Sequence, residues 1–75
     1  MSERLPRVTE RAVLAALARD GWYIARQRTH AVLRHPTKPG RVVVPRHRGK
    51  TLKPGTLDAI IEDAGLTPEE FRRLL

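Results

Sequence analysis

Two helical patterns with clear start and stop signals enclose three short strand patterns, and this order limits the possible folds more than any other feature. The first helical pattern begins after Thr9, a residue type that caps helix N-termini well, and ends at Gly21. Within it, Val13, Leu14 and Leu17 recur at helical spacing on one face. We therefore expect one amphipathic helix between these two signals.

Three short segments after this helix have the composition of strands. Residues 22–27 and 29–35 alternate with a period of two, and the connection between them is short enough to predict a tight hairpin. The sequence PTKPG at 36–40 is a turn by composition. It leads into RVVVP at 41–45, which we expect to form a third strand that its proline ends.

The chain then returns to a helical pattern. Pro54 suits the first turn of a second helix, and Gly65 closes it. Leu57, Ile60 and Ile61 recur at helical spacing and would form its apolar face. These signals predict a second helix that packs on the sheet.

The C-terminal sequence TPEEFRRLL predicts a third, short helix. Thr67 as N-cap and Glu70 three residues later form a capping box, with Pro68 at the first helical position. Phe71 and Leu74 are expected to pack inward. The full order predicts an α+β fold with a three-stranded antiparallel sheet, in which helices cover one face and leave the other for solvent or a ligand.

The chain has 75 residues, which is enough for one domain with one modest core. We expect a single domain over 1–75 with a loose N-terminal tail over 1–8. A domain of this size favours a functional site on its surface. The chain has no cysteine, which excludes disulfides and thiolate metal sites and is consistent with the cytoplasm. The longest apolar run near the start, 12–18, is too short for a signal peptide or a membrane span.

Positive charge is concentrated in the middle of the chain. The net charge is +7, to which residues 1–21 contribute +1 and residues 56–75 contribute −3. Residues 22–55 hold nine Lys and Arg and all three histidines, without an Asp or Glu. A solubilising surface explains scattered lysines better than it explains such a band. The band predicts a polyanion, most often nucleic acid, as partner, because arginine forks suit phosphate geometry.

The histidines of this basic band are candidates for chemistry. His30 and His35 differ by an odd number, so they lie on opposite faces of the second strand and cannot converge on one metal ion. Neither face is wholly apolar, so the strand alone does not tell which one the helices cover. We expect no metal site and no cofactor.

RNA cleavage suits a histidine among arginines. The attacking 2′-hydroxyl needs a base, the leaving 5′-oxygen needs an acid, and histidine can serve either role. Arginines would stabilise the charge that develops on the phosphate. The other interpretation is a plain phosphate contact or surface residue.

Four stretches in order resemble one known family: GWYIARQ, THAVLRHP, VVVPRH and LKPGTLDAIIEDAGLTPEEF. They are similar to the HicA toxins, also called the YcfA-like family, over about 9–75. The resemblance implies a double-stranded-RNA-binding-domain-like α-β-β-β-α fold. It also implies a ribosome-independent mRNA endoribonuclease that needs no metal, with a HicB antitoxin as partner.

The resemblance implies His30 as the catalytic histidine. The family reads Arg-Gln-any-Gly-Ser-His before and at this position, whereas this chain reads Arg26, Gln27, Arg28, Thr29 and His30. The connection is one residue shorter and lacks the glycine, so the turn must be built differently. Thr29 can replace the serine hydroxyl.

The resemblance also aligns His47 with the histidine that follows the family's Val-Pro element. It is a second catalytic candidate, and a contact to phosphate or backbone is an equally good interpretation. Arg34 shares the face of His30, Trp22 is expected in the core, and Tyr23 could stack on bases. A cationic rim is expected at Arg46, Arg48, Lys50 and Lys53. The full set expected to bind RNA is Arg26, Gln27, Arg28, Thr29, Arg34, Arg46, Arg48, Lys50 and Lys53.

Three functions stay open at this point. The first is a toxin ribonuclease that cleaves mRNA with His30 as acid or base. The second is a non-catalytic RNA-binding module of the same fold. The third is a protein whose basic band mainly docks an acidic antitoxin. No membrane partner is expected.

Overall fold

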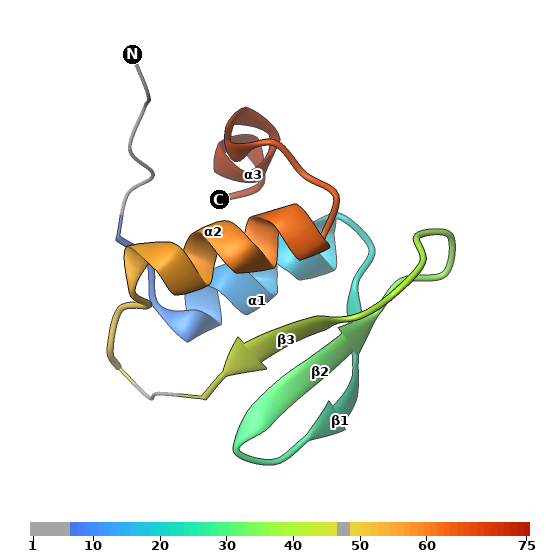
Figure 1. Cartoon of the computed structure of the whole chain (residues 1–75), viewed down its shortest axis with the longest axis horizontal. Helices are drawn as coiled ribbons and strands as arrows, with labels where there is room; N and C mark the ends of the chain where they lie inside the picture. The colour runs from blue at the N-terminus through green and yellow to red at the C-terminus, as the bar shows by residue number, and fades with distance from the viewer. Residues whose placement is uncertain (1–6, 47–48) are drawn as a thin grey trace.

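The computed structural model of the chain describes residues 7–46 and 49–75 and has the predicted order of elements (Figure 1). It confirms the α+β class, because one helix, three antiparallel strands in an open sheet and two further helices follow one another. The elements are α1 (Glu10–Arg19), β1 (Tyr23–Gln27), β2 (His30–Arg34), β3 (Val42–Pro45), α2 (Pro54–Asp63) and α3 (Pro68–Leu74).

Local signals set both ends of α1. The Thr9 hydroxyl Oγ1 accepts a hydrogen bond from the Ala12 N–H at 3.2 Å, which confirms the predicted N-cap. At the other end Gly21 has a φ of +108°, which side-chain-bearing residues rarely adopt. A Cβ at Gly21 would also lie 2.7 Å from Nε2 of His35. Backbone angle and packing therefore both require glycine here.

The two C-terminal helices begin as predicted. Pro54 is the first residue of α2, and Gly65 follows its C-terminal end with a φ of +69°. At α3, the Thr67 hydroxyl accepts from the Glu70 N–H at 3.1 Å, and the Glu70 carboxylate accepts from the Thr67 N–H at 2.9 Å. This reciprocal pair confirms the capping box.

The sheet has the order β1-β2-β3, with β2 in the centre. In β2, Ala31 and Leu33 are buried, whereas His30 and Arg34 are exposed. The helices therefore cover the side of Ala31, which settles what strand alternation alone left open. The other side, on which His30 and Arg34 lie, is called the open face below.

β1 is an edge strand that no part of the core covers. All five of its residues are exposed. Its pairing with β2 shifts by one residue between Ile24 and Arg26, which indicates a β-bulge at Ala25. The hairpin therefore combines a strand with one buried face, β2, and a strand whose residues are all exposed, β1.

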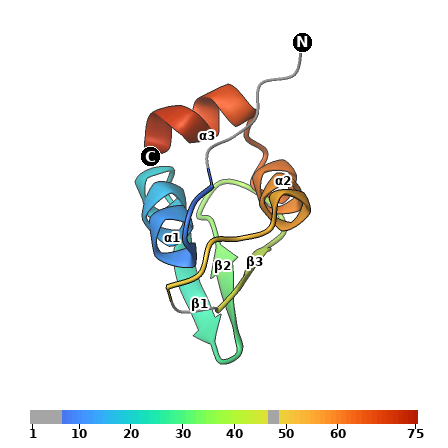
Figure 2. The same cartoon turned by 90° about the vertical axis from the view of Figure 1, so that its left-hand side faces the viewer.

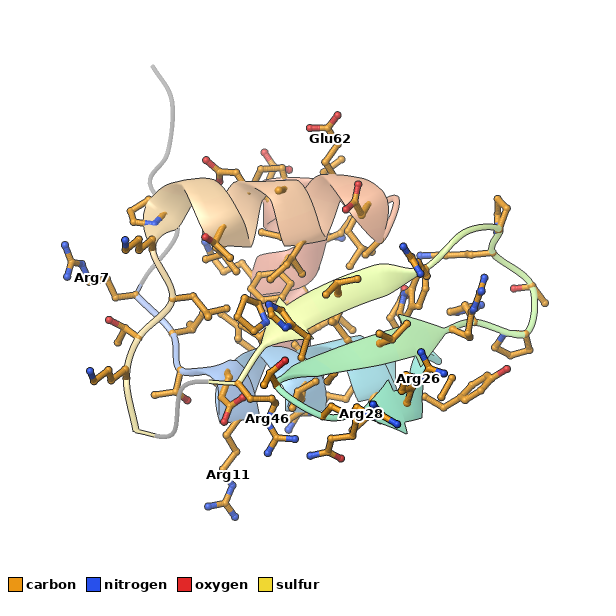
Figure 3. The ribbon with its side chains drawn as sticks, turned by 60° about the horizontal axis from the view of Figure 1, so that its bottom comes forward. Arg7, Arg11, Arg26, Arg28, Arg46 and Glu62 are labelled. Carbon is orange, nitrogen blue, oxygen red and sulfur yellow. The ribbon has the colours of Figure 1, made fainter. Side chains whose placement is uncertain are left out.

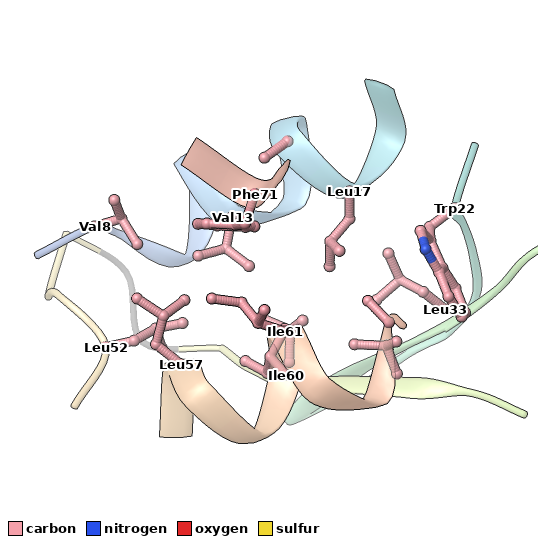
Figure 4. Close-up of a cluster of buried hydrophobic side chains, with 14 of the residues drawn as sticks. Val8, Val13, Leu17, Trp22, Leu33, Leu52, Leu57, Ile60, Ile61 and Phe71 are labelled. Carbon is pink, nitrogen blue, oxygen red and sulfur yellow. The ribbon is translucent and has the colours of Figure 1, made fainter. Parts of the chain in front are cut away.

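The core lies between the sheet and a layer of helices. α1 and α2 occupy the same side of the sheet, and α3 lies across both (Figure 2). Phe71 of α3 is fully buried between them, and Trp22 is buried beside the sheet, as expected for both residues (Figure 4). The core comprises Val8, Val13, Ala16, Leu17, Trp22, Ala31, Leu33, Val42, Val44, Leu52, Leu57, Ile60, Ile61, Ala64 and Phe71.

The turn at 36–40 is tied to two helix ends. Lys38 Nζ lies 2.6 Å from Asp20 Oδ2 and donates to the carbonyl of Ala64 at 3.1 Å, so it links the ends of α1 and α2. His35 Nδ1 accepts from the backbone N–H groups of Thr37 and Lys38, each at 3.1 Å. The ring proton therefore sits on Nε2, which donates to the Asp20 carbonyl at 2.7 Å. His35 is thus committed to the fold.

The described residues before α1 belong to the fold. Val8 is buried, its carbonyl accepts from the Leu52 N–H at 2.9 Å, and Thr9 bridges to Thr51. Val8 thus belongs to the core although the predicted tail over 1–8 included it, and residues 1–6 of that tail lie outside the described residues. Within the described chain, no helix combines the length and the apolar character that crossing a membrane requires.

Candidate functional site

His30 lies at the tip of the β1–β2 hairpin. It is the first residue of β2, it is exposed, and it pairs with Pro45 of β3. The Arg28 N–H donates to the His30 carbonyl at 3.0 Å, and the Arg46 N–H donates to the Thr29 carbonyl at 3.1 Å. One bond within the hairpin and one from the residue after β3 therefore hold the turn at Arg28 and Thr29.

This turn needs no glycine. Among the described residues, no side-chain-bearing residue has a positive φ. Arg28 and Thr29 thus connect the strands without the left-handed conformation that glycine supplies in the family pattern.

Thr29 contacts the imidazole of His30 directly. Its Oγ1 lies 3.1 Å from His30 Nδ1. If Nδ1–H donates to this oxygen, Nε2 offers a lone pair, and if the hydroxyl donates to Nδ1, Nε2 carries the proton. In either tautomer Nε2 is the ring nitrogen that can exchange a proton with a ligand. The contact therefore leaves both the base and the acid role open to His30.

A buried ion pair lies behind the hairpin tip. Glu10, the first residue of α1, is only 4% exposed, and its Oε2 lies 2.7 Å from Arg46 Nε. The two groups are in ion-pair contact without the alignment of a hydrogen bond. The Gln27 amide, oriented with its oxygen toward the guanidinium, accepts from Arg46 Nη2 at 3.2 Å. α1, β1 and the residue after β3 thus meet at one arginine.

The predicted cationic rim is wrong for Arg46. Its side chain is only 25% exposed and is directed to Glu10 rather than outward. Lys50 and Lys53 are exposed, but they belong to the segment that leads to α2, where Lys53 is the N-cap residue. The rim residue Arg48 and the catalytic candidate His47 lie outside the described residues.

The open face gathers arginines around His30. Strand pairing sets Arg26 opposite Val32 and Tyr23 opposite Arg34. Because directly paired residues share one side of a sheet, Arg26 and Arg34 lie on the same face as His30. Figure 3 shows Arg26 and Arg28 along the hairpin, with Glu62 pointing outward from α2 on the opposite side of the view. No Asp or Glu occurs anywhere in residues 22–55, so the strands bring no negative charge to this face.

Arg34 is fixed at the other end of β2. Its Nη1 donates to the Gly40 carbonyl at 3.2 Å, which holds the guanidinium over the turn. Its remaining N–H groups can still meet an anion, since a guanidinium has five donors. Of the predicted RNA-binding residues, Arg26, Arg28, Thr29 and Arg34 thus lie on the hairpin and open face with His30, whereas Gln27 and Arg46 lie behind it.

The described residues show no metal-binding cluster. Among residues 7–46 and 49–75, no three His, Cys, Asp or Glu side chains come together in a way that could hold an ion.

Comparison with known families identifies the chain. Residues 11–66 match the family model described as "HicA toxin of bacterial toxin-antitoxin". The chain belongs to the HicA toxin family. The match covers most of the 75 residues, including the whole sheet, and it confirms the resemblance inferred from the sequence. Comparison with curated proteins finds none that matches.

Membership of the HicA toxin family defines the general role of the molecule. It is the toxin of a bacterial toxin–antitoxin pair, and an antitoxin is its partner. The matched range includes His30 and the arginines of the hairpin and open face.

Sequence reasoning missed Glu10 as a part of this HicA site. In the sequence it looks like an ordinary acidic residue in the first turn of a helix, where its negative charge interacts favourably with the helix dipole. The sequence did contain one signal for such a contact. Residues 22–55 hold nine cations and no acid, so any carboxylate that pairs with them must come from another part of the chain. Which acid would reach the band depends on how α1 packs.

Proposed function

We propose that this toxin is an endoribonuclease that cleaves mRNA in the cytoplasm, without a metal ion or the ribosome, and that His30 transfers the protons. One observation carries the proposal: an exposed histidine, in contact with a hydroxyl, stands at the edge of a basic sheet face whose strands contain no acid. Membership of a toxin family supports it.

The chemistry follows from the groups around His30. The 2′-oxygen of RNA attacks the adjacent phosphorus and loses its proton, the bond to the 5′-oxygen breaks, and that oxygen gains a proton. The products are a 2′,3′-cyclic phosphate and a 5′-hydroxyl. Nε2 of His30 would take the first proton or give the second, while Thr29 holds the ring through Nδ1. Arg28 adjoins His30 at the hairpin tip and Arg26 lies on the same face of the sheet, so their guanidinium groups would offset charge on the phosphate.

The partner proposed for this toxin is a HicB-type antitoxin. A strongly basic face is complementary to an acidic protein, and such a protein would block RNA most simply by covering the same face. Arg26, Arg28 and Arg34 would then serve both RNA and antitoxin. This sharing also explains why the third function considered from the sequence, antitoxin docking alone, uses the same residues.

Cleavage in EDTA tests the proposal. Purified wild type, His30→Ala and Thr29→Val are incubated with a long single-stranded RNA, and the fragment ends are identified. We expect cyclic or 3′-phosphate ends from the wild type and none from His30→Ala. Loss of the hydroxyl in Thr29→Val should lower the rate about 2- to 10-fold, and Thr29→Ser should restore it.

The alternatives give different results in the same experiment. Equal cleavage by wild type and His30→Ala would reject His30 and direct attention to His47. RNA binding without cleavage by either would favour the non-catalytic RNA-binding module. Weak RNA binding together with tight binding of the antitoxin would favour a docking role. Thermal unfolding of each variant shows whether a loss of activity is a loss of fold.

A further inference from the structure

Tyr23 is the most exposed large hydrophobic residue of the described chain. The residue is 54% exposed although it lies in a strand. An aromatic ring in this position contributes little to the core, because it lies on the face of the sheet that the helices do not cover. The other exposed apolar residue of the open face is Val43, which pairs with Val32 in the middle of the sheet.

The register of the strands places Tyr23 on the same face as His30, beside the opposite end of β2. Tyr23 is directly opposite Arg34, so its ring lies on the open face. His30 and Arg34 are the two ends of β2, about 13 Å apart along the strand. The strand pairing, extended by one residue at each end, arranges the residues of the open face in three rows across the sheet. From the hairpin tip to the far end, the rows are Arg28, His30 and Pro45; Arg26, Val32 and Val43; and Tyr23, Arg34 and Arg41.

This face combines a cation in each of its three rows with one exposed ring. Arg28 lies in the row of His30, Arg26 lies in the middle row opposite Val32, and Arg34 lies opposite the ring. Groups of this kind bind single-stranded nucleic acid, in which cations follow the phosphates and aromatic rings stack on unpaired bases. In a duplex the bases already stack on each other and would not meet the ring.

We propose that Tyr23, flanked by Arg34, forms a stacking subsite for a base of single-stranded RNA whose cleaved phosphate lies at His30. The proposal rests on the proposed function and deepens it, because it assigns a residue that binds a base and names β2 as the path of the RNA strand. Arg34 holds a phosphate beside the stacked base. Tyr23 is a binding residue here and takes no part in proton transfer.

The test measures binding rather than cleavage. A single-stranded oligonucleotide of 2′-O-methyl RNA lacks the nucleophilic hydroxyl, so its affinity does not depend on whether His30 is catalytic. Fluorescence anisotropy compares wild type, Tyr23→Leu and Tyr23→Phe. Leucine keeps apolar bulk without an aromatic ring, and phenylalanine keeps the ring without the hydroxyl.

We expect Tyr23→Leu to weaken binding about 5- to 100-fold and Tyr23→Phe to stay within about 2-fold of wild type. With an abasic oligonucleotide of the same length, wild type and Tyr23→Leu should bind alike. A duplex of the same sequence should bind without any effect of Tyr23→Leu.

Three results would overturn the subsite. Tyr23→Leu could bind the single strand as well as wild type does, it could lose the same factor on abasic RNA, or it could bind RNA normally and lose affinity only for the antitoxin. The last result would make the ring a protein contact. These outcomes are separate from failure of the proposed function, which appears as cleavage that is absent or independent of His30.

Discussion

Oε2 of Glu10 and Nε of Arg46 lie 2.7 Å apart at the point where α1 passes behind the β1–β2 hairpin. The same arginine donates its backbone N–H to the carbonyl of Thr29 at 3.1 Å. Thr29 in turn contacts Nδ1 of His30. A buried carboxylate on a helix is therefore connected through one arginine to the exposed histidine, and we expect it to position the turn.

Removing the carboxylate should affect both stability and the site. In Glu10→Ala the guanidinium of Arg46 loses its partner, which should lower the free energy of unfolding by about 1–3 kcal/mol in urea titrations. If cleavage is established, kcat should fall with KM nearly unchanged, because RNA still meets the same exposed arginines. The control Glu62→Ala removes an exposed acid from α2 and should stay within about 0.5 kcal/mol of wild type. Equal stability of the two variants would show that the ion pair does not brace the turn.

Glycine at position 21 should be hard to replace. Gly21→Ala combines a φ of +108° with a Cβ 2.7 Å from His35 Nε2, and that ring cannot move easily because both of its nitrogens are hydrogen-bonded. We expect a loss of about 1–3 kcal/mol in the free energy of unfolding. Gly55→Ala is the matched control, since a Cβ there meets nothing within 4 Å and position 55 lies in the first turn of α2. It should be neutral or stabilise by about 0.4–1 kcal/mol, so similar losses in both variants would contradict the explanation.

We expect the arginines of the open face to contribute to the salt dependence of RNA binding. Arg34→Ala should weaken binding of single-stranded RNA about 10-fold. It should also reduce the slope of log affinity against log salt by about 0.7, the contribution of one phosphate contact. Arg73→Ala removes the same charge from α3, on the helix side of the molecule, and should leave the slope unchanged. Identical slopes for the two variants would mean that binding follows net charge and not this face.

The capping box of α3 should make stability depend on acid pH. The backbone hydrogen bond from Thr67, followed by the bond with its side chain, lowers the pKa of Glu70. A lowered pKa in the folded state means that the group's contribution is fully present above its unfolded value, about 4.3, and is lost as pH falls through the folded value.

Urea unfolding midpoints between about pH 6 and about pH 3 measure this contribution. Glu70→Gln should be less stable than wild type at pH 6, and its midpoint should fall less as the pH drops. The control Glu69→Gln changes the other acid in the first turn of α3 and should keep the decline of the wild type. A decline in Glu70→Gln as large as that of wild type would show that the capping carboxylate is not its source.

Local signals explain why so much of the fold was predictable from the sequence. The caps at Thr9 and Thr67 and the stops at Gly21 and Gly65 depend on a few neighbouring residues, and each one holds in the structure. The strand segments were also correct to within two residues at each end, since their alternation and turn residues are local as well.

Contacts between residues far apart in the sequence were harder to predict from the sequence. Alternation showed that His30 and His35 lie on opposite faces, but only the packing of the helices shows that His30 is the exposed one and that His35 supports a turn. The sequence shows no acid within the basic band because its acidic partners come from the two ends of the α1 region: Glu10, the first residue of α1, pairs with Arg46, and Asp20, the residue that caps α1, pairs with Lys38. The composition of 36–40 indicates only a turn, because the groups that Lys38 contacts, Asp20 and the Ala64 carbonyl, lie far away in the sequence.

The exposed position of β1 has a consequence for how the protein can vary. The helices, β2 and β3 supply the buried strand and helix residues of the core, while all five residues of β1 are exposed. Substitutions at Tyr23 or Arg26 therefore have little influence on folding free energy. Substitutions in β1 can therefore change the binding specificity of the open face, while the other elements keep His30 in the same place.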